Sequence, residues 1–130
     1  MTSTKFDANQ RDWLCIPTKL NPEAQQPSDL CIVLSTTATQ EDALQLAHTL
    51  VEARLVACAQ VLAPMQSVYG WEGKIEQTTE YGLVLKTTRQ QLSSLEARLM
   101  ELHSYESPEF VVLAAEASRG YERWLRASVR

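Results

Sequence analysis

The pattern of hydrophobic and polar residues between positions 30 and 63 predicts a strand, a helix and a second strand, in that order. The apolar, β-branched run 30–34 is typical of a buried strand. Apolar residues then recur at helical spacing up to about Ala53, and Thr39 followed by Asp42 predicts a capped start for this helix. Residues 55–63 are apolar on both alternating faces apart from Gln60, which predicts a second strand covered by helices on one side and by something else on the other.

A long hairpin is predicted next. Pro64 should bend or bulge the second strand, because proline cannot donate to a sheet ladder. Glu72 and Gly73 offer the positive φ that a tight turn needs, and the chain then returns through residues 74–87 as a third strand.

The pattern of the remaining chain completes one fold. Thr88 and Gln91 form a second capping box, and leucines at helical spacing predict a helix that stops near His103. The apolar run 110–115 predicts a fourth strand, and residues 121–127 a short terminal helix. This order predicts an α+β, ferredoxin-like split βαβ fold with both main helices on one face of an antiparallel sheet.

Such a fold leaves one face of its sheet uncovered. The hairpin of about 33 residues from Leu55 to Thr87 also reaches beyond the helices, which cannot cover Val68, Tyr69 and Trp71 in its outer half. Exposed strand edges and apolar faces of this kind are usually covered by other subunits. We therefore expect an oligomer.

Length and composition divide the chain into one domain and a tail. The 130 residues make room for a single ordinary domain, which we place at 29–130. Residues 1–28 are polar and contain three prolines, so we expect a flexible extension. Acidic and basic residues balance in the extension, and the net charge of -4 therefore belongs to the domain. This charge argues against nucleic acid as a partner.

The expected cellular location depends on apolar segments and cysteine motifs. The longest apolar stretch, 110–115, is too short to span a membrane or to serve as a signal peptide core, so neither membrane insertion nor secretion is expected. Three cysteines without CxxC spacing fit neither a disulfide framework nor a zinc knuckle. A cytoplasmic location is the simplest expectation.

Two clusters could carry chemistry. At the hairpin tip, Tyr69, Trp71, Glu72 and Lys74 surround the turn, either as interface anchors or as a wall of an intersubunit pocket.

The second cluster is the segment 103–109. His103 at a helix C-terminus can simply complement the helix dipole. With Tyr105 and Glu109 it also offers nitrogen and oxygen donors that suit copper or zinc. The same three residues could serve as acid and base, but no nucleophile or cofactor motif accompanies them, so an enzyme is not expected.

Three residues of the central strands have structural interpretations. Cys58 lies among apolar neighbours and is expected to be a buried, inert thiol. Glu80 and Lys86 share a strand face, where a charged pair usually forms a solvated or interface salt bridge.

Five segments, in order from about Leu30 to Ser128, resemble the CutA family of divalent-cation tolerance proteins. They are Leu55-Val56-Ala57-Cys58, Ser67-Val68-Tyr69-Gly70-Trp71-Glu72-Gly73-Lys74, Leu85-Lys86-Thr87, His103-Ser104-Tyr105-Glu106-Ser107-Pro108-Glu109 and Tyr121-Glu122-Arg123-Trp124. The resemblance implies a cytoplasmic homotrimer with hairpins packed between subunits. Its intersubunit cleft would correspond to Cys58, Tyr69, Trp71, Glu72, Lys74, Lys86, His103, Tyr105 and Glu109.

The resemblance also implies tolerance of, and binding to, copper or other divalent cations, with His103 as the metal ligand and no obligatory cofactor. Copper-binding members can carry a cysteine at the end of the first strand and paired histidines after the second helix. Here Ser35 and Leu102 stand at two of those positions, so weak binding is expected. The alternative is a small-molecule sensor or signalling trimer that holds an anionic ligand through Lys74 and Lys86.

Overall fold

The computed structural model describes residues 29–130, so the predicted extension 1–28 lies outside the described residues. The elements are β1 (Leu30–Thr37), α1 (Gln40–Glu52), β2 (Cys58–Trp71), β3 (Lys74–Thr88), the 3₁₀ turn η2 (Arg89–Gln91), α2 (Leu92–Leu102), β4 (Val111–Ala115) and α3 (Arg119–Ser128). None of the helices in this range is long and apolar enough to cross a membrane.

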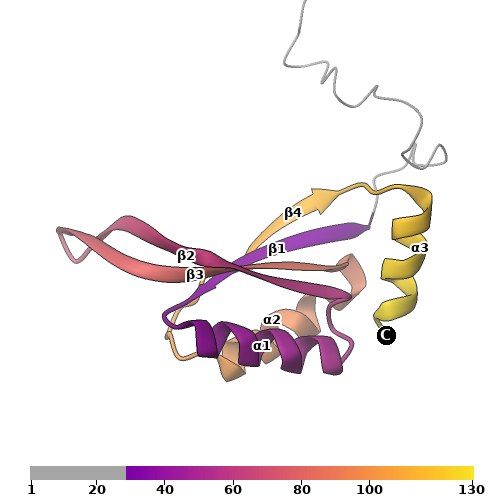
Figure 1. The fold of residues 1–130 in the computed structure, drawn as a ribbon, viewed down its shortest axis with the longest axis horizontal. Helices are drawn as coiled ribbons and strands as arrows, with labels where there is room; N and C mark the ends of the chain where they lie inside the picture. Colours follow the sequence, from indigo (N-terminus) through magenta and orange to yellow (C-terminus); the bar gives the residue numbers. More distant parts are fainter. Residues whose placement is uncertain (1–28) are drawn as a thin grey trace, which may run out of the picture.

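The four strands form one antiparallel sheet in the order β2-β3-β1-β4. Helices α1 and α2 lie side by side on one face, and α3 packs at the end of the sheet far from the hairpin tip (Figure 1). This is the predicted ferredoxin-like split βαβ arrangement, and it leaves much of the second face of the sheet without a helix over it.

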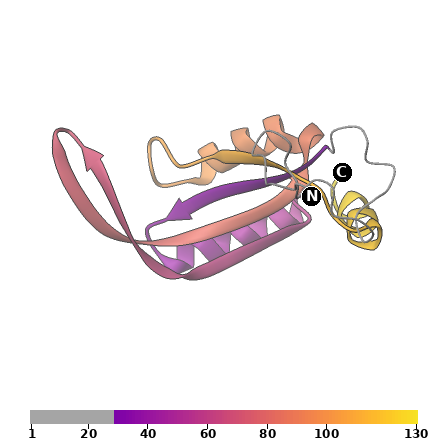
Figure 2. The same ribbon diagram turned by 90° about the horizontal axis from the view of Figure 1, so that it is seen from above.

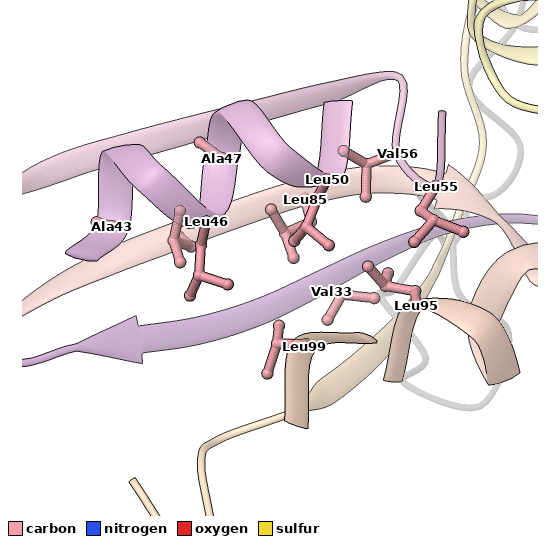
Figure 3. Packing of buried hydrophobic residues seen from close by; sticks show 11 residues of the cluster. Val33, Ala43, Leu46, Ala47, Leu50, Leu55, Val56, Leu85, Leu95 and Leu99 are labelled. Carbon is pink, nitrogen blue, oxygen red and sulfur yellow. The ribbon is translucent and has the colours of Figure 1, made fainter. Parts of the chain in front are cut away.

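The main core lies between the sheet and helices α1 and α2 (Figure 3). Leu50 of α1 and Leu95 and Leu99 of α2 are fully buried against Val33 and Leu85 of the sheet. Burying each leucine contributes roughly 1.5–3 kcal/mol relative to leaving it in water. A smaller cluster lies under α3 and consists of Leu30, Ala57, Leu125 and Val129.

Arg54 joins the end of α1 to the end of α3. Its guanidinium donates hydrogen bonds to the carbonyl oxygens of Ala127 (2.8 Å), Ser128 (3.3 Å) and Val129 (3.3 Å). Arg54 has a φ of 62°, in the left-handed region that residues other than glycine rarely adopt. The clamp therefore satisfies carbonyl groups that every helix C-terminus leaves open, at a position where the backbone is strained.

One predicted helix cap is confirmed and the other is wrong. Thr39 Oγ1 accepts a hydrogen bond from the Asp42 amide (3.1 Å) and begins α1 as expected. Thr88 makes no cap hydrogen bond, because the turn η2 intervenes and α2 begins only at Leu92. Within residues 29–130, the buried Thr88 hydroxyl has no hydrogen-bond partner.

The predicted start of the second strand at Leu55 is also wrong. Leu55–Ala57 are buried, but they form the connection to β2, which begins at Cys58. Their backbone groups are satisfied from several sides: the Leu55 amide donates to the Leu50 carbonyl, the Leu55 carbonyl accepts from the Thr87 hydroxyl, and the Ala57 amide donates to the Lys86 carbonyl. Apolar burial therefore does not require a strand here.

The first strand and the last helix are longer than the apolar pattern predicted. β1 continues through Thr37, and its polar end, Ser35 to Thr37, is buried. α3 begins at Arg119 instead of Tyr121. Both extensions use polar residues, which a search for apolar residues misses.

The hairpin of β2 and β3 projects past the helices and curves away from the sheet (Figure 2). Its turn places Glu72 at φ 51° and Gly73 at φ 79°, as the sequence predicted for a two-residue turn. The pairing register shifts between Val61 and Pro64, which confirms the predicted irregularity at the proline. Tip residues such as Ile75 remain mostly exposed.

Candidate functional site

A carboxylate lies at the root of the hairpin and holds two neighbouring segments. The Tyr105 hydroxyl, from the loop after α2, donates to Glu80 Oε2 of β3 at 2.9 Å, and Thr36 Oγ1 of β1 donates to the same oxygen at 3.3 Å. Together with His103 these residues form the polar group that we call the Glu80 cluster. It connects the sheet to the loop between α2 and β4.

His103 is fixed by both of its ring nitrogens. The residue ends α2, and its ring Nδ1 accepts a hydrogen bond from the Tyr105 amide at 3.0 Å. Nδ1 is therefore unprotonated, so Nε2 carries the hydrogen and donates to the Thr36 carbonyl at 2.6 Å. In this arrangement neither nitrogen has a lone pair free for a metal. The His103 and Tyr105 rings lie 4.8 Å apart.

The surroundings of Tyr105 keep its hydroxyl protonated. Burial, the hydrogen bond to Glu80 and the nearby negative charge raise its pKa to about 12. Tyr105 therefore acts as a hydrogen-bond donor and not as a base near neutral pH.

The predicted tip residues lie farther out along the hairpin. Trp71, Glu72 and Lys74 are exposed around the turn. Tyr69 lies closer to the Glu80 cluster and accepts a hydrogen bond from Thr78 Oγ1 at 3.5 Å. Thr78 precedes Glu80 by two residues on β3, so Tyr69 is the predicted tip residue nearest to the Glu80 cluster along the hairpin.

Cys58 and Lys86 form a third group at the other end of the hairpin, where they are paired across β2 and β3. Lys86 Nζ donates to the Tyr121 hydroxyl at 3.3 Å and lies 5.3 Å from the centre of that ring. Cys58 begins β2 and is half-buried, so the expectation of a thiol enclosed within a strand is wrong.

The expected pairing of Glu80 with Lys86 is also wrong, because each has another partner. Glu80 bonds to Tyr105 and Thr36, whereas Lys86 contacts Tyr121. Glu109 is exposed in the segment before β4 and makes no hydrogen bond or ion pair with any residue in 29–130. One chain therefore brings together His103 and Tyr105, but not the full predicted cleft.

Glu80 is the residue that the sequence-based site missed. Its only signal was a carboxylate in a strand whose neighbours, Tyr81 and Leu83, are apolar. Its partners lie in β1 and in the loop after α2, at 44 and 25 residues' distance along the chain, and no local pattern links them.

The residues of a single chain do not complete a metal site. Across residues 29–130 there is no group of three or more His, Cys, Asp or Glu side chains that could hold a metal ion. Ser35 is buried with no hydrogen-bond partner for its hydroxyl within the same range, and Leu102 offers no donor. Both His103 nitrogens are occupied. A complete site would need a change at His103 and donors from another chain.

The split βαβ sheet, the long projecting hairpin and the polar cluster at its root define a ferredoxin-like α+β protein with an exposed apolar surface on its hairpin. A family model described as CutA1 divalent ion tolerance protein matches residues 31–128. The chain belongs to this family, and the resemblance noted from its sequence is confirmed.

Several relatives are similar over most of their length. The divalent-cation tolerance protein CutA of Thermus thermophilus is 40% identical over 96 residues, which cover 73% of this chain and 93% of the relative. The solved structure of CutA from Synechococcus elongatus PCC7942 is 42% identical, with a TM-score of 0.75 over 79% of this chain and 92% of that one.

A second solved structure bears on the cellular location of the protein. It is described as the periplasmic divalent cation tolerance protein CutA from Archaeoglobus fulgidus, and it is 27% identical to this chain, with a TM-score of 0.74. The match covers 78% of this chain and 99% of the solved one. Since a family member is described as periplasmic, the cytoplasmic location expected for this chain stays a prediction.

Proposed function

We propose that this chain is a cytoplasmic, non-enzymatic homotrimer that binds divalent cations weakly in clefts between its subunits. The observation that carries the proposal is the Glu80 cluster, which places an oriented carboxylate at the root of an uncovered hairpin. Membership of a family named for divalent ion tolerance supports the same proposal.

Assembly is supported by the surface of the hairpin. Val68, Trp71 and Ile75 are 64%, 61% and 78% exposed, and they occupy one continuous projection. Val111 and Leu113 of the edge strand β4 are exposed as well. Large apolar side chains gathered in this way mark protein interfaces. Hairpins packed between three subunits would cover them.

Metal binding is supported by the donors that the Glu80 cluster offers. Glu80 Oε2 accepts from Tyr105 and Thr36, while Oε1 makes no hydrogen bond within the described residues and can serve as an oxygen ligand. His103 supplies a nitrogen ligand if Nδ1 releases the Tyr105 amide. The loss of that hydrogen bond opposes binding, and a site with so few donors from each chain is expected to bind weakly.

Calorimetric titration with Cu(II) and Zn(II) tests the site. Glu80→Gln and His103→Ala should each weaken binding about tenfold or more, whereas Glu52→Gln, an exposed control at the end of α1, should leave the isotherm unchanged. Isotherms that are identical for wild type and Glu80→Gln would remove this carboxylate from the site. Identical isotherms for His103→Ala would leave His103 with its structural role alone.

Sedimentation tests the assembly. Trp71→Ser with Ile75→Ser should shift the protein from trimer toward monomer, because both side chains are exposed in one chain. Leu44→Ser, an exposed leucine on α1, is the matched control and should leave the trimer intact. A wild-type protein that sediments as a monomer at all concentrations would overturn the proposed trimer.

Binding of a small anion is the alternative function. Lys86 contacts Tyr121 but makes no ion pair within residues 29–130, so its positive charge is uncompensated. Lys74 lies at the opposite end of β3, and only another chain could bring the two lysines together. A thermal-shift experiment with citrate should then show stabilisation that Lys86→Ala removes; no shift with wild type would exclude this alternative.

A further inference from the structure

A cavity of about 160 Å³ lies on the helix side of the fold, where the start of α1 meets the end of α2. Its polar lining consists of Thr37, Asp42, Gln45, Thr49, His103 and Ser104. A cavity needs only about 10–15 Å³ to hold a water, and sites for drug-sized ligands measure roughly 300–1,000 Å³. This cavity therefore has room for a small organic molecule.

The charges around the cavity are one-sided. Asp42 is its only charged lining residue, and the carboxylate makes no hydrogen bond or ion pair with any described residue. The last turn of α2, which ends at this cavity, contains no basic residue to offset the negative pole of the helix. Asp42 itself lies in the first turn of α1.

The other lining groups add acceptors rather than cations. The His103 ring is neutral, because its Nδ1 accepts the Tyr105 amide hydrogen. The side chains of Gln45, Thr49 and Ser104 hold oxygen atoms that make no hydrogen bond within residues 29–130. Leu46 and Leu102 supply an apolar wall. A cationic head with a short apolar body would satisfy all of these surfaces.

We propose that this cavity binds a small organic amine, with the ammonium group donating to Asp42 and the carbon chain lying against Leu46 and Leu102. A divalent metal ion fits less well, because a single carboxylate cannot complete its coordination and the described residues hold no cluster of three ligands. The cavity shares His103 with the Glu80 cluster, but its carboxylate is Asp42 and not Glu80.

Nuclear magnetic resonance titration with ethanolamine tests this site on the full chain. Amide signals of residues that line the cavity should shift, with a dissociation constant in the millimolar range that is typical of so small a ligand. Asp42→Asn should weaken binding about tenfold, since it removes a charged hydrogen-bond partner. Glu41→Gln, in the same helix turn but outside the cavity, should bind as wild type.

Three comparisons decide the outcome. Ethylene glycol, the neutral analogue, and potassium chloride at equal ionic strength should shift none of these signals. Equal shifts with the glycol, with potassium or in Asp42→Asn would overturn the proposal, as would the absence of any shift. Glu80→Gln removes the proposed metal ligand but does not change the lining of the cavity, so it should leave ethanolamine binding unchanged and test the amine site apart from the metal site.

Discussion

The two ends of β3 belong to one strand but have opposite surroundings. Leu83 and Leu85 are 1% and 0% exposed beneath the helices, whereas Ile75, ten residues before Leu85, is 78% exposed. The helix-covered end gains its stability from this chain alone. The outer end carries Ile75, which is just as apolar, without burying it, as the proposed trimer would require of a residue at a subunit contact.

Substitutions at the two ends of β3 should have the largest effects on stability, and the two effects should depend differently on protein concentration. Leu85→Ala should lower the free energy of unfolding by about 2–5 kcal/mol at every protein concentration, because it opens a cavity in the core. Ile75→Ala should act only where subunits associate, so its effect should depend on protein concentration. Chemical denaturation at several concentrations measures both, and equal, concentration-independent losses would refute the contrast.

Arg54 tests how the covered end is secured. Arg54→Ala removes three hydrogen bonds to the C-terminal carbonyls of α3 but keeps the strained backbone, and should cost about 1–2 kcal/mol. Arg54→Gly removes the same bonds and also relieves the left-handed conformation, so it should be more stable than Arg54→Ala by about 1 kcal/mol. Hydrogen exchange of the α3 amides should rise in both variants, and unchanged exchange would show that Arg54 does not hold the helix.

The two threonines at the predicted helix starts give a smaller contrast within the covered end. Thr39→Ala should destabilise the fold by about 1 kcal/mol, because it removes the cap of α1. Thr88→Val should be neutral or stabilising, because it removes a buried hydroxyl that has no partner in 29–130. Thermal unfolding measures both, and an equal loss in the two variants would contradict the cap assignment.

Tyr105 lies at the boundary between the covered and the outer end of β3, and its expected effect on stability is the smallest of those compared. Folding raises its pKa from 10.0 to about 12. Its contribution to stability is therefore complete below pH 10.0 and is lost as the pH rises through about 12. Ultraviolet titration should show one tyrosine ionising late. Glu80→Gln should make that tyrosine ionise at lower pH, and Tyr105→Phe should remove the late step; a late step that survives in Tyr105→Phe would assign it elsewhere.

The sequence predicted those parts of the fold that are coded locally. Helical spacing, the Thr39 cap, the Glu72 and Gly73 turn and the irregularity at Pro64 all depend on residues close together in the chain. The cap at Thr88 failed because a 3₁₀ turn satisfies the same segment in another way.

The candidate site was only partly predictable, because only some of its residues lie close together in the sequence. His103 and Tyr105 are neighbours in sequence, so their proximity was expected. The contact between Glu80 and Tyr105 depends on the sheet register and on the path of the loop after α2, and no local sequence motif determines either. In the proposed trimer, the remaining cleft residues would converge only through a second chain, and a single sequence does not place that chain.

The two hydrogen bonds of the His103 ring also make it a spectroscopic probe. The chain has two histidines, and His48 is exposed on α1. The nitrogen resonances of an imidazole differ between its tautomers, so His103, with hydrogen on Nε2, should give a signal distinct from that of a freely exchanging ring. One spectrum of two imidazoles can thus follow whether this loop opens when metal, amine or another subunit is added.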